Sequence, residues 1–185
     1  MTFSKWGNYR IFLFSNSILG LAMGLFMPFW MVFIQDFGGG SLEQFGFAIG
    51  LMTLAQSITS YFAGRHSDKW GRKIFLIVGG FVLTGVTLAY TLITSMVQLY
   101  LLQVINGITN SLQMTMETAF LGDTTKKGKR GTDIGKYHAL VGIMAGIAMM
   151  LGGFLAGRLG FRIIFYIVAG IIFISTVLLF NIQEQ

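Results

Sequence analysis

The chain has no cysteine, a single proline and few charged residues. The absence of cysteine excludes disulfide bonds and thiolate metal sites. Only 11% of the 185 residues are charged and 54% are hydrophobic, whereas a soluble domain carries about 25% charged residues. This leaves too little polar surface to cover a water-soluble fold. The composition therefore predicts an integral, multi-pass membrane protein surrounded by lipid.

The sequence also lacks the patterns that carry enzyme chemistry. Its two histidines, His66 and His138, stand apart from each other, and no His/Glu cluster has metal-ligand spacing. There is no nucleophile elbow and no glycine loop of the kind that cradles phosphate. We therefore expect no enzyme activity, no metal and no cofactor. The net charge of +6 could indicate nucleic-acid binding, but the basic residues lie between apolar runs, so we interpret them as topology charge and expect no nucleic-acid partner.

Six apolar runs account for most of the chain. At about 20 residues each, six membrane-spanning helices use about 120 residues, so little remains for loops and we expect one all-α domain over residues 1–185. Pro28 predicts a kink near the outer end of the first span, because neighbouring helices can satisfy the carbonyl that proline frees. Ser41 with Gln44, and Ser95 with Gln98, predict capping boxes at two helix starts. The predicted spans are residues 11–34, 42–62, 74–93, 96–121, 136–156 and 163–180.

The basic residues are distributed unequally between the two ends of these spans. Eleven lie on one side and two, Arg158 and Arg162, on the other, which makes up the thirteen in the chain. Lys and Arg in short loops stay on the cytoplasmic side. The imbalance therefore predicts that both termini are cytoplasmic. The eleven are Lys5, Arg10, Arg65, Lys69, Arg72, Lys73, Lys126, Lys127, Lys129, Arg130 and Lys136.

The segment from Gly64 to Lys73 is the most specific motif of the chain. It reads Gly-Arg-His-Ser-Asp-Lys-Trp-Gly-Arg-Lys and lies between the second and third predicted spans, where we expect a tight hairpin. It resembles the loop between helices 2 and 3 of the major facilitator superfamily of secondary transporters, although His66 departs from the usual aliphatic residue. The residues that match the family pattern are Gly64, Ser67, Asp68, Lys69, Gly71, Arg72 and Lys73.

The resemblance implies both a fold and a function. The fold would be the amino-terminal six-helix half of such a transporter, built from two inverted three-helix repeats. The function would be transport of a small solute across the cell membrane by alternating access, with the missing carboxy-terminal half or a second copy of the chain as partner. In the family, the Asp of the motif helps to close the inner side, and the following Arg pairs with an acid at the inner end of span 4. These roles fall on Asp68, Arg72 and Asp123.

The fourth predicted span carries a stripe of polar residues. Five of them follow one another at steps of 3, 4, 3 and 4, which keeps them on one helix face. This face lines either a solute path or a contact with another helix through hydrogen bonds, and span 4 lines the cavity in the family that the chain resembles. Asn16 in the first span is a further candidate for the path. The stripe consists of Gln103, Asn106, Asn110, Gln113 and Glu117.

Glu117 is the one acidic residue of this stripe and lies near the inner end of the predicted span. A charge inside a membrane is costly, and protonation would remove much of that cost. One interpretation is a site for a proton or another cation that is coupled to transport. The alternative is an acid that pairs with a basic loop residue or reaches interfacial water. The sequence leaves both open.

Small residues on the fifth predicted span indicate close helix packing. Gly142, Gly146, Gly153 and Gly157 lie on one stripe, for which we expect a helix–helix seam. Spans 3 and 6 are almost uniformly apolar, so we expect them to face lipid.

Two departures from patterns of the family weigh against proton antiport and drug efflux. Ala148 and Met149 stand where the antiporter pattern has Gly-Pro, and Gln103 stands where a second pattern has Arg. Two other function classes also remain open: a membrane scaffold that transports nothing, and an oligomeric channel lined by span 4.

Overall fold

The structure is a computed structural model that describes residues 2–38, 41–125 and 128–183, and the side chains of residues 2–6, 36–38 and 64–70 lie outside this description. The described residues form helices and no strand, which confirms the all-α prediction. The helices are α1 (Thr2–Phe26), η1 (Met27–Phe29), α2 (Trp30–Gly38), α3 (Leu42–Trp70), α4 (Arg72–Ala89), α5 (Met96–Thr124), α6 (Arg130–Leu159), α7 (Phe161–Leu178) and η2 (Leu179–Asn181).

Five helical segments of the described chain are long and apolar enough to cross a membrane. The helix α5 is not among them. Its 29 residues give it a length of about 43 Å, but the polar stripe lowers its hydropathy. The length and composition of the other helices support the prediction of a multi-pass membrane protein. The five segments are Gly7–Gln35, Leu42–Ala63, Arg72–Ala89, Arg130–Leu159 and Phe161–Asn181.

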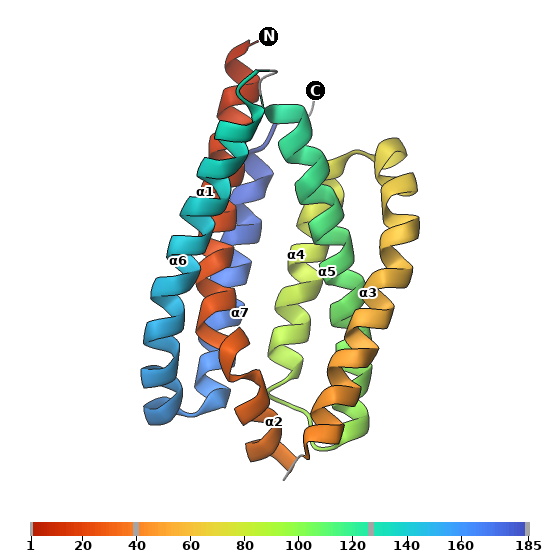
Figure 1. The fold of residues 1–185 in the computed structure, drawn as a ribbon, viewed down its shortest axis with the longest axis vertical. Helices are drawn as coiled ribbons and strands as arrows, with labels where there is room; N and C mark the ends of the chain where they lie inside the picture. The colour runs from red at the N-terminus through yellow and green to blue at the C-terminus, as the bar shows by residue number, and fades with distance from the viewer. Residues whose placement is uncertain (1, 39–40, 126–127, 184–185) are drawn as a thin grey trace.

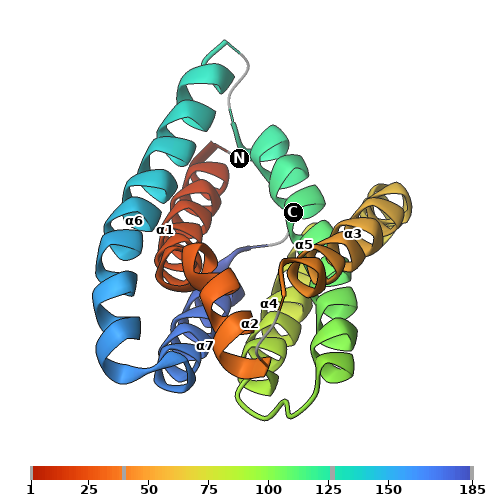
Figure 2. The same cartoon turned by 60° about the horizontal axis from the view of Figure 1, so that its bottom comes forward.

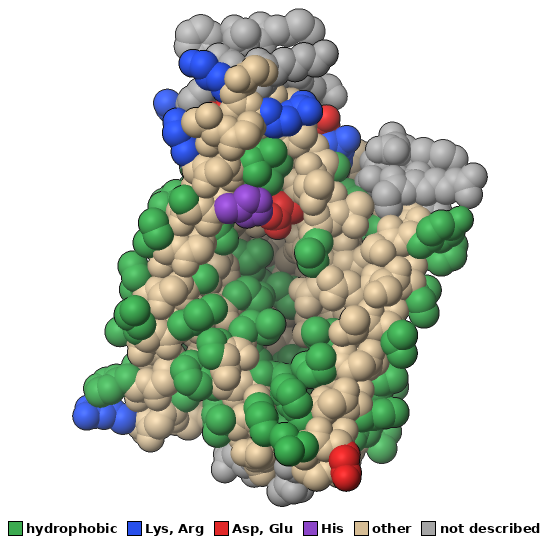
Figure 3. All heavy atoms as spheres, viewed as in Figure 1, with side chains coloured by type: hydrophobic (Ala, Val, Ile, Leu, Met, Phe, Trp, Pro, Cys, Tyr) green, Lys and Arg blue, Asp and Glu red, His purple; other side chains and the backbone are tan. Residues whose placement is uncertain are grey.

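The long helices form two groups of three. The helix α1 packs against α6 and α7, and α5 packs in the same way against α3 and α4. The two groups meet mainly where α4 lies beside α7 (Figure 2). Both termini lie at the same end of the bundle, together with the α3–α4 and α5–α6 connections (Figure 1). The Lys and Arg side chains visible in Figure 3 gather mainly at this end.

Each group contains a helix pair that is joined through a single glycine. Gly71 separates α3 from α4, Gly160 separates α6 from α7, and their φ angles are 79° and 77°. This left-handed region suits glycine because a Cβ atom would be strained there. The prediction of a hairpin loop over residues 64–73 is therefore wrong in extent, since α3 continues as a helix through Trp70. The helix α6 is also longer than predicted, since it covers Arg130–Leu159 and not only residues 136–156.

Glycines at the contact between α1 and α6 allow the two backbones to approach closely. A Cβ atom at Gly20 would lie 2.9 Å from the carbonyl oxygen of Val141. A Cβ atom at Gly24 would overlap the carbonyl oxygen of Ala145 and lie 2.9 Å from the Cβ of Ala148. The other group repeats this arrangement, since a Cβ atom at Gly107 on α5 would overlap the carbonyl oxygen of Met52 on α3. Each group therefore has one helix seam that only glycine permits.

The predicted glycine stripe of the fifth span is not this seam. Added Cβ atoms at Gly142, Gly146 and Gly157 would meet nothing within 4 Å, and one at Gly153 would meet only the Phe29 ring. The prediction that these four glycines form a helix–helix seam is therefore wrong for contacts within the chain. The spacing of the small residues identified the correct helix but the wrong face, because spacing alone does not show which stripe faces a neighbouring helix. The residues of α6 at the seam are Val141, Ala145, Ala148 and Gly152.

Two local predictions can be compared directly with the backbone. The first span is interrupted by the short helix η1, whose first residues include Pro28, which confirms the kink. Ser41 and Gln44 form the complete capping box. The box predicted at Ser95 is half formed: the Ser95 hydroxyl accepts from the Gln98 N–H, but the Gln98 side chain accepts from the N–H of Thr94.

The two apolar helices α4 and α7 do not simply face lipid. Each buries one face in the bundle, and Ile164, Phe165 and Ile172 of α7 are almost fully enclosed. Ser15 of α1 and Ser175 of α7 each donate from the hydroxyl to the other's backbone carbonyl at 2.8 Å. The expectation of purely lipid-facing helices is therefore wrong, because a uniformly apolar sequence does not distinguish a lipid face from a core face.

Candidate functional site

A cavity of about 440 Å³ opens into the bundle between the two groups of helices. Figure 3 shows a hollow, lined largely by hydrophobic side chains, in the face between α6 and α3. The cavity walls come from all the long helices except α6. The lining residues are Ala22, Met23, Phe26, Met27, Pro28, Trp30, Met31, Phe45, Ile49, Met52, Gln56, Leu83, Thr87, Tyr90, Gln103, Asn106, Asn110, Met114, Phe165 and Val168.

The polar wall of the cavity comes mainly from the α5 stripe. Gln103, Asn106 and Asn110 all line it. The Tyr90 hydroxyl donates to Oε1 of Gln103 at 2.9 Å, and the Asn110 amide donates to Oδ1 of Asn106 at 3.4 Å. Gln56 on α3 adds a fourth side-chain amide to this wall. Three of the five residues of the predicted stripe thus reach one cavity.

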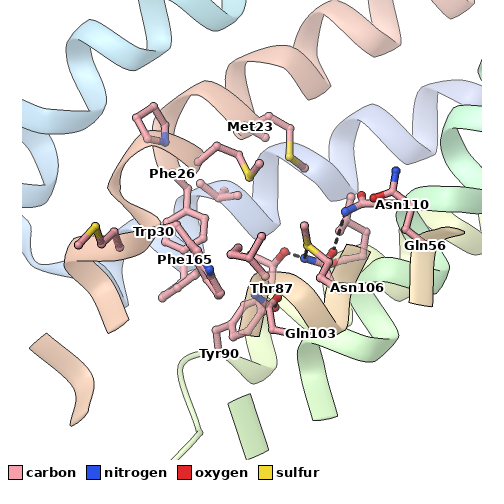
Figure 4. A pocket seen from close by; sticks show the side chains of 18 of the residues that line it. Met23, Phe26, Trp30, Gln56, Thr87, Tyr90, Gln103, Asn106, Asn110 and Phe165 are labelled. Atoms are coloured by element: carbon pink, nitrogen blue, oxygen red, sulfur yellow. Dashed lines mark hydrogen bonds between the residues drawn. The ribbon is translucent and has the colours of Figure 1, made fainter. Parts of the chain in front are cut away.

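The opposite wall is aromatic. Trp30 lies edge-on to both Phe26 and Tyr90, with ring centroids 4.9 Å apart in each pair. Phe165 of α7 lies 4.4 Å from Phe26 and 5.5 Å from Tyr90, centroid to centroid. Figure 4 shows Phe26, Trp30 and Phe165 together on one side and Gln56, Asn106 and Asn110 on the other, with Gln103 and Tyr90 between them. The cavity is therefore amphipathic, with one flat apolar wall and one amide wall.

The remaining residues predicted for the solute path lie elsewhere. The Gln113 amide donates to the Leu76 carbonyl of α4 at 3.3 Å, so this side chain joins two helices. The Asn16 amide donates to the carbonyl of Phe12 in its own helix at 3.0 Å. Neither residue lines the cavity. The two interpretations of the stripe thus apply to different parts of it: its first three residues line the cavity, and Gln113 makes a helix contact.

Glu117 faces α6 at the end of the bundle where the termini lie. Its carboxylate interacts with the hydroxyl of Tyr137 and with the imidazole of His138. Tyr137 is 1% exposed, and its ring stacks on Phe12 with centroids 5.8 Å apart. The neighbouring Tyr9 hydroxyl donates to the backbone carbonyl of Asp133 at 2.7 Å. Glu117 therefore connects the two groups of helices, and its partners within the described part of the chain include Tyr137 and His138.

The proposed gate motif is described only in part. Arg72 forms an ion pair with Asp123 and also donates to the carbonyl of Ala119, so it lies at the carboxyl end of α5. A cation at that position is favoured by the helix dipole as well as by the carboxylate. Gly71 is the helix junction, and Lys73 belongs to the first turn of α4. Gly64 and Asp68 lie in the helical backbone of α3, but Asp68 is outside the described side chains.

Sequence reasoning missed the aromatic wall of the cavity. Trp30, Tyr90 and Phe165 come from three different helices, and no spacing in the sequence links them. One signal was available: Trp30 follows Pro28 by two residues, at the break in the first span, and both residues line the cavity. Gln56 was also detectable as an isolated amide in an apolar span.

Helices that span a membrane and enclose an amphipathic cavity between two similar groups define a polytopic carrier-like protein. The family model of the Major Facilitator Superfamily matches residues 5–184. The chain therefore belongs to the Major Facilitator Superfamily, whose members are integral membrane transporters and not enzymes.

Several relatives differ in how much of their length the chain covers. The chain is 33% identical over 154 residues to the uncharacterized MFS-type transporter YitZ of Bacillus subtilis, which covers 83% of the chain and 93% of YitZ. It is 28% identical over 184 residues to the multi-drug resistance efflux pump PmrA of Streptococcus pneumoniae, which covers 96% of the chain and 45% of the pump. It is 30% identical over 170 residues to Multidrug resistance protein 2 of Bacillus subtilis, which covers 90% of the chain and 42% of that protein. The chain thus spans less than half of the two resistance proteins but almost all of YitZ.

Proposed function

We propose that the chain is one half of a carrier that moves a small solute across the membrane by alternating access. The observation that carries this proposal is the 440 Å³ cavity between the two helix groups, with amides on one wall and aromatic rings on the other. In transporters built from repeats, the substrate binds near the middle of the membrane at the repeat interface. The cavity opens on the face that a second half would cover, so it would lie at the interface between the two halves (Figure 3).

The fold supports two repeats in inverted orientation with six membrane crossings. The helices that correspond under this pairing are α1 with α5, α3 with α6, and α4 with α7. The members of the last pair have 18 residues each, and those of the second pair have 29 and 30. The seam glycines and the junction glycines also correspond. With α5 as the sixth crossing, an even number of spans leaves both termini on one side, and the basic residues favour the cytoplasm.

A second six-helix unit is the partner that this arrangement favours. In the apolar windows of α3 and α6 only 6% and 11% of the residues are buried, against 44% in those of α1, α4 and α7. The cavity opens between these two least buried helices, so a unit that closes the cavity would cover both. The partner would be either a carboxy-terminal half or a second copy of the chain.

Solute counterflow tests the carrier against its rivals. Membrane vesicles containing the chain, or the longer polypeptide if it is part of one, are loaded with unlabelled solute, and uptake of labelled solute is followed. A carrier accelerates labelled uptake when the opposite side is loaded, because the loaded site returns faster than the empty one. A channel gives uptake without this trans-stimulation, and a scaffold gives neither. Either of these two results would contradict the proposal.

The ion pair between Arg72 and Asp123 gives a testable gate. Arg72 is 24% and Asp123 62% exposed, and an exposed pair contributes only about 0.2–1 kcal/mol to stability. We expect Arg72→Asp to leave insertion intact, because the loss of an exposed pair costs little stability. Counterflow should slow severalfold, because two acids then repel each other at the end of α5 where the gate would close. The charge-swapped variant Arg72→Asp with Asp123→Arg should recover most of the rate. Equal rates in the wild type and in Arg72→Asp would remove this pair from the gate.

Glu117 is the position that we propose for a coupled proton. It lies between the helix groups, where the interaction with Tyr137 depends on the relative position of α5 and α6. Movement of the groups would change the surroundings of the carboxylate and so its affinity for a proton.

A further inference from the structure

Two hydrogen-bond donors in the cavity wall are buried without a partner. Nε1 of Trp30 and Nε2 of Gln103 form no hydrogen bond among the described residues, and the side chains are 7% and 1% exposed. Both residues line the cavity. An unsatisfied buried donor costs about 1–3 kcal/mol, and native proteins leave few of them. This pair therefore indicates that the cavity wall is built to donate hydrogen bonds to a guest.

Packing holds both donors in position. The Gln103 carbonyl oxygen accepts from the Tyr90 hydroxyl at 2.9 Å, so Tyr90 holds this side chain in place, and its NH₂ group has no partner among the described residues. The Trp30 ring is held edge-on between Phe26 and Tyr90. Tyr90 contacts both donor side chains and so fixes their relative position. Donors that are fixed before binding lose little entropy when a ligand arrives.

The rest of the lining restricts the charge and shape of the guest. Among the described lining residues there is no Asp, Glu, Lys, Arg or His. A charged guest would lose its hydration and gain no opposite charge from this wall. The rings of Phe26, Trp30, Tyr90 and Phe165 favour a flat, apolar body.

We propose that this wall selects uncharged, flat solutes that carry a hydrogen-bond acceptor, such as a ketone or amide carbonyl. The acceptor receives hydrogen bonds from the Gln103 amide and the Trp30 indole, and the body of the solute lies against the aromatic rings. The proposal rests on the proposed function, because it names the substrate class of the same cavity. Its test measures binding alone, so the two can fail separately.

Two probes that differ by one acceptor test the proposal. Fluorenone and fluorene share a flat tricyclic body, and only fluorenone has a carbonyl. Binding to the full chain in lipid nanodiscs is measured by equilibrium dialysis, with empty nanodiscs subtracted. We expect fluorenone to bind at least about tenfold more tightly than fluorene, because two net hydrogen bonds form and each contributes a factor of severalfold. Gln103→Leu should abolish most of this preference, and Trp30→Phe, which keeps a ring but removes the N–H, should reduce it.

Gln113→Leu is the matched control. It makes the same substitution on the same helix stripe, but Gln113 contacts Leu76 of α4 and does not line the cavity. The preference for fluorenone should therefore persist in this variant. A wild-type protein without the preference, or one that keeps it in both Gln103→Leu and Trp30→Phe, would overturn the proposal. So would tighter binding of either charged probe, the fluorene-9-carboxylate anion or the 9-aminoacridine cation. Acceptor-dependent binding without counterflow would contradict the proposed function and leave this inference standing.

Discussion

Gly24→Leu is expected to separate α1 from α6 and to destabilise the fold strongly. Even a Cβ atom at this position would overlap the carbonyl oxygen of Ala145 and crowd Ala148. Because the first obstacle is backbone, it cannot rotate away as a side chain could. Overpacking costs about 1–3 kcal/mol, and contact with backbone places this substitution at the upper end. Thermal unfolding of the purified protein in detergent measures the loss.

Gly142→Leu provides the comparison on the other helix of the same pair. A Cβ atom at Gly142 would meet nothing within 4 Å. Both substitutions gain about the same helix propensity, up to about 1 kcal/mol. The difference in stability between the two variants therefore measures the effect of the clash at the seam alone. We expect Gly142→Leu to unfold at or above the wild-type temperature. Similar melting temperatures for the two variants would mean that α1 and α6 do not pack as described.

The two seams show what could and could not be predicted from the sequence. Apolar length identified the long helices, but the seam between α1 and α6 depends on Gly20 and Gly24, which the predicted glycine stripe did not include. On α6 more than one residue in three is Gly or Ala, so several stripes fit a seam equally well. The choice between Gly142 and Ala145 depends on the direction in which the neighbouring helix lies. That direction is a property of the assembled bundle and not of local spacing.

The cavity shows the same limit for the candidate site. A helical period placed Gln103, Asn106 and Asn110 on one face, and all three line the cavity. The same period also included Gln113, because periodicity does not show where the cavity ends along the helix. The aromatic wall escaped detection because aromatic residues are ordinary in a membrane span. Trp30 and Phe165 differ from other core residues only in the space beside them, and tertiary packing creates that space.

The extent of the basic hairpin could not be predicted for a local reason. Charged residues in a short segment between spans are typical of a loop, but Arg and Lys are good helix formers. The segment contains no proline, so nothing ends α3 before Gly71. The helix thus carries the motif beyond the apolar part of the span, and Gly71 alone turns the chain.

Met23→Trp is expected to block the cavity while leaving the fold intact. Met23 is half-buried on α1 and lines the cavity, and Figure 4 shows it above the gap between the aromatic and amide walls. A larger, rigid ring at this position competes with any guest for the same volume. Overpacking costs about 1–3 kcal/mol, so a guest in the same volume should bind about five- to 150-fold more weakly. Counterflow in vesicles should fall to a similar extent.

The control for this prediction is the same substitution on the outside of the bundle. Met150 on α6 is 83% exposed, so Met150→Trp adds the same ring without entering the cavity. It should retain counterflow, and both variants should unfold near the wild-type temperature because neither places the new ring against backbone. Loss of counterflow only in Met23→Trp would assign the transport path to this cavity. Full counterflow in Met23→Trp would place the path elsewhere, because a solute cannot pass through a site that a tryptophan occupies.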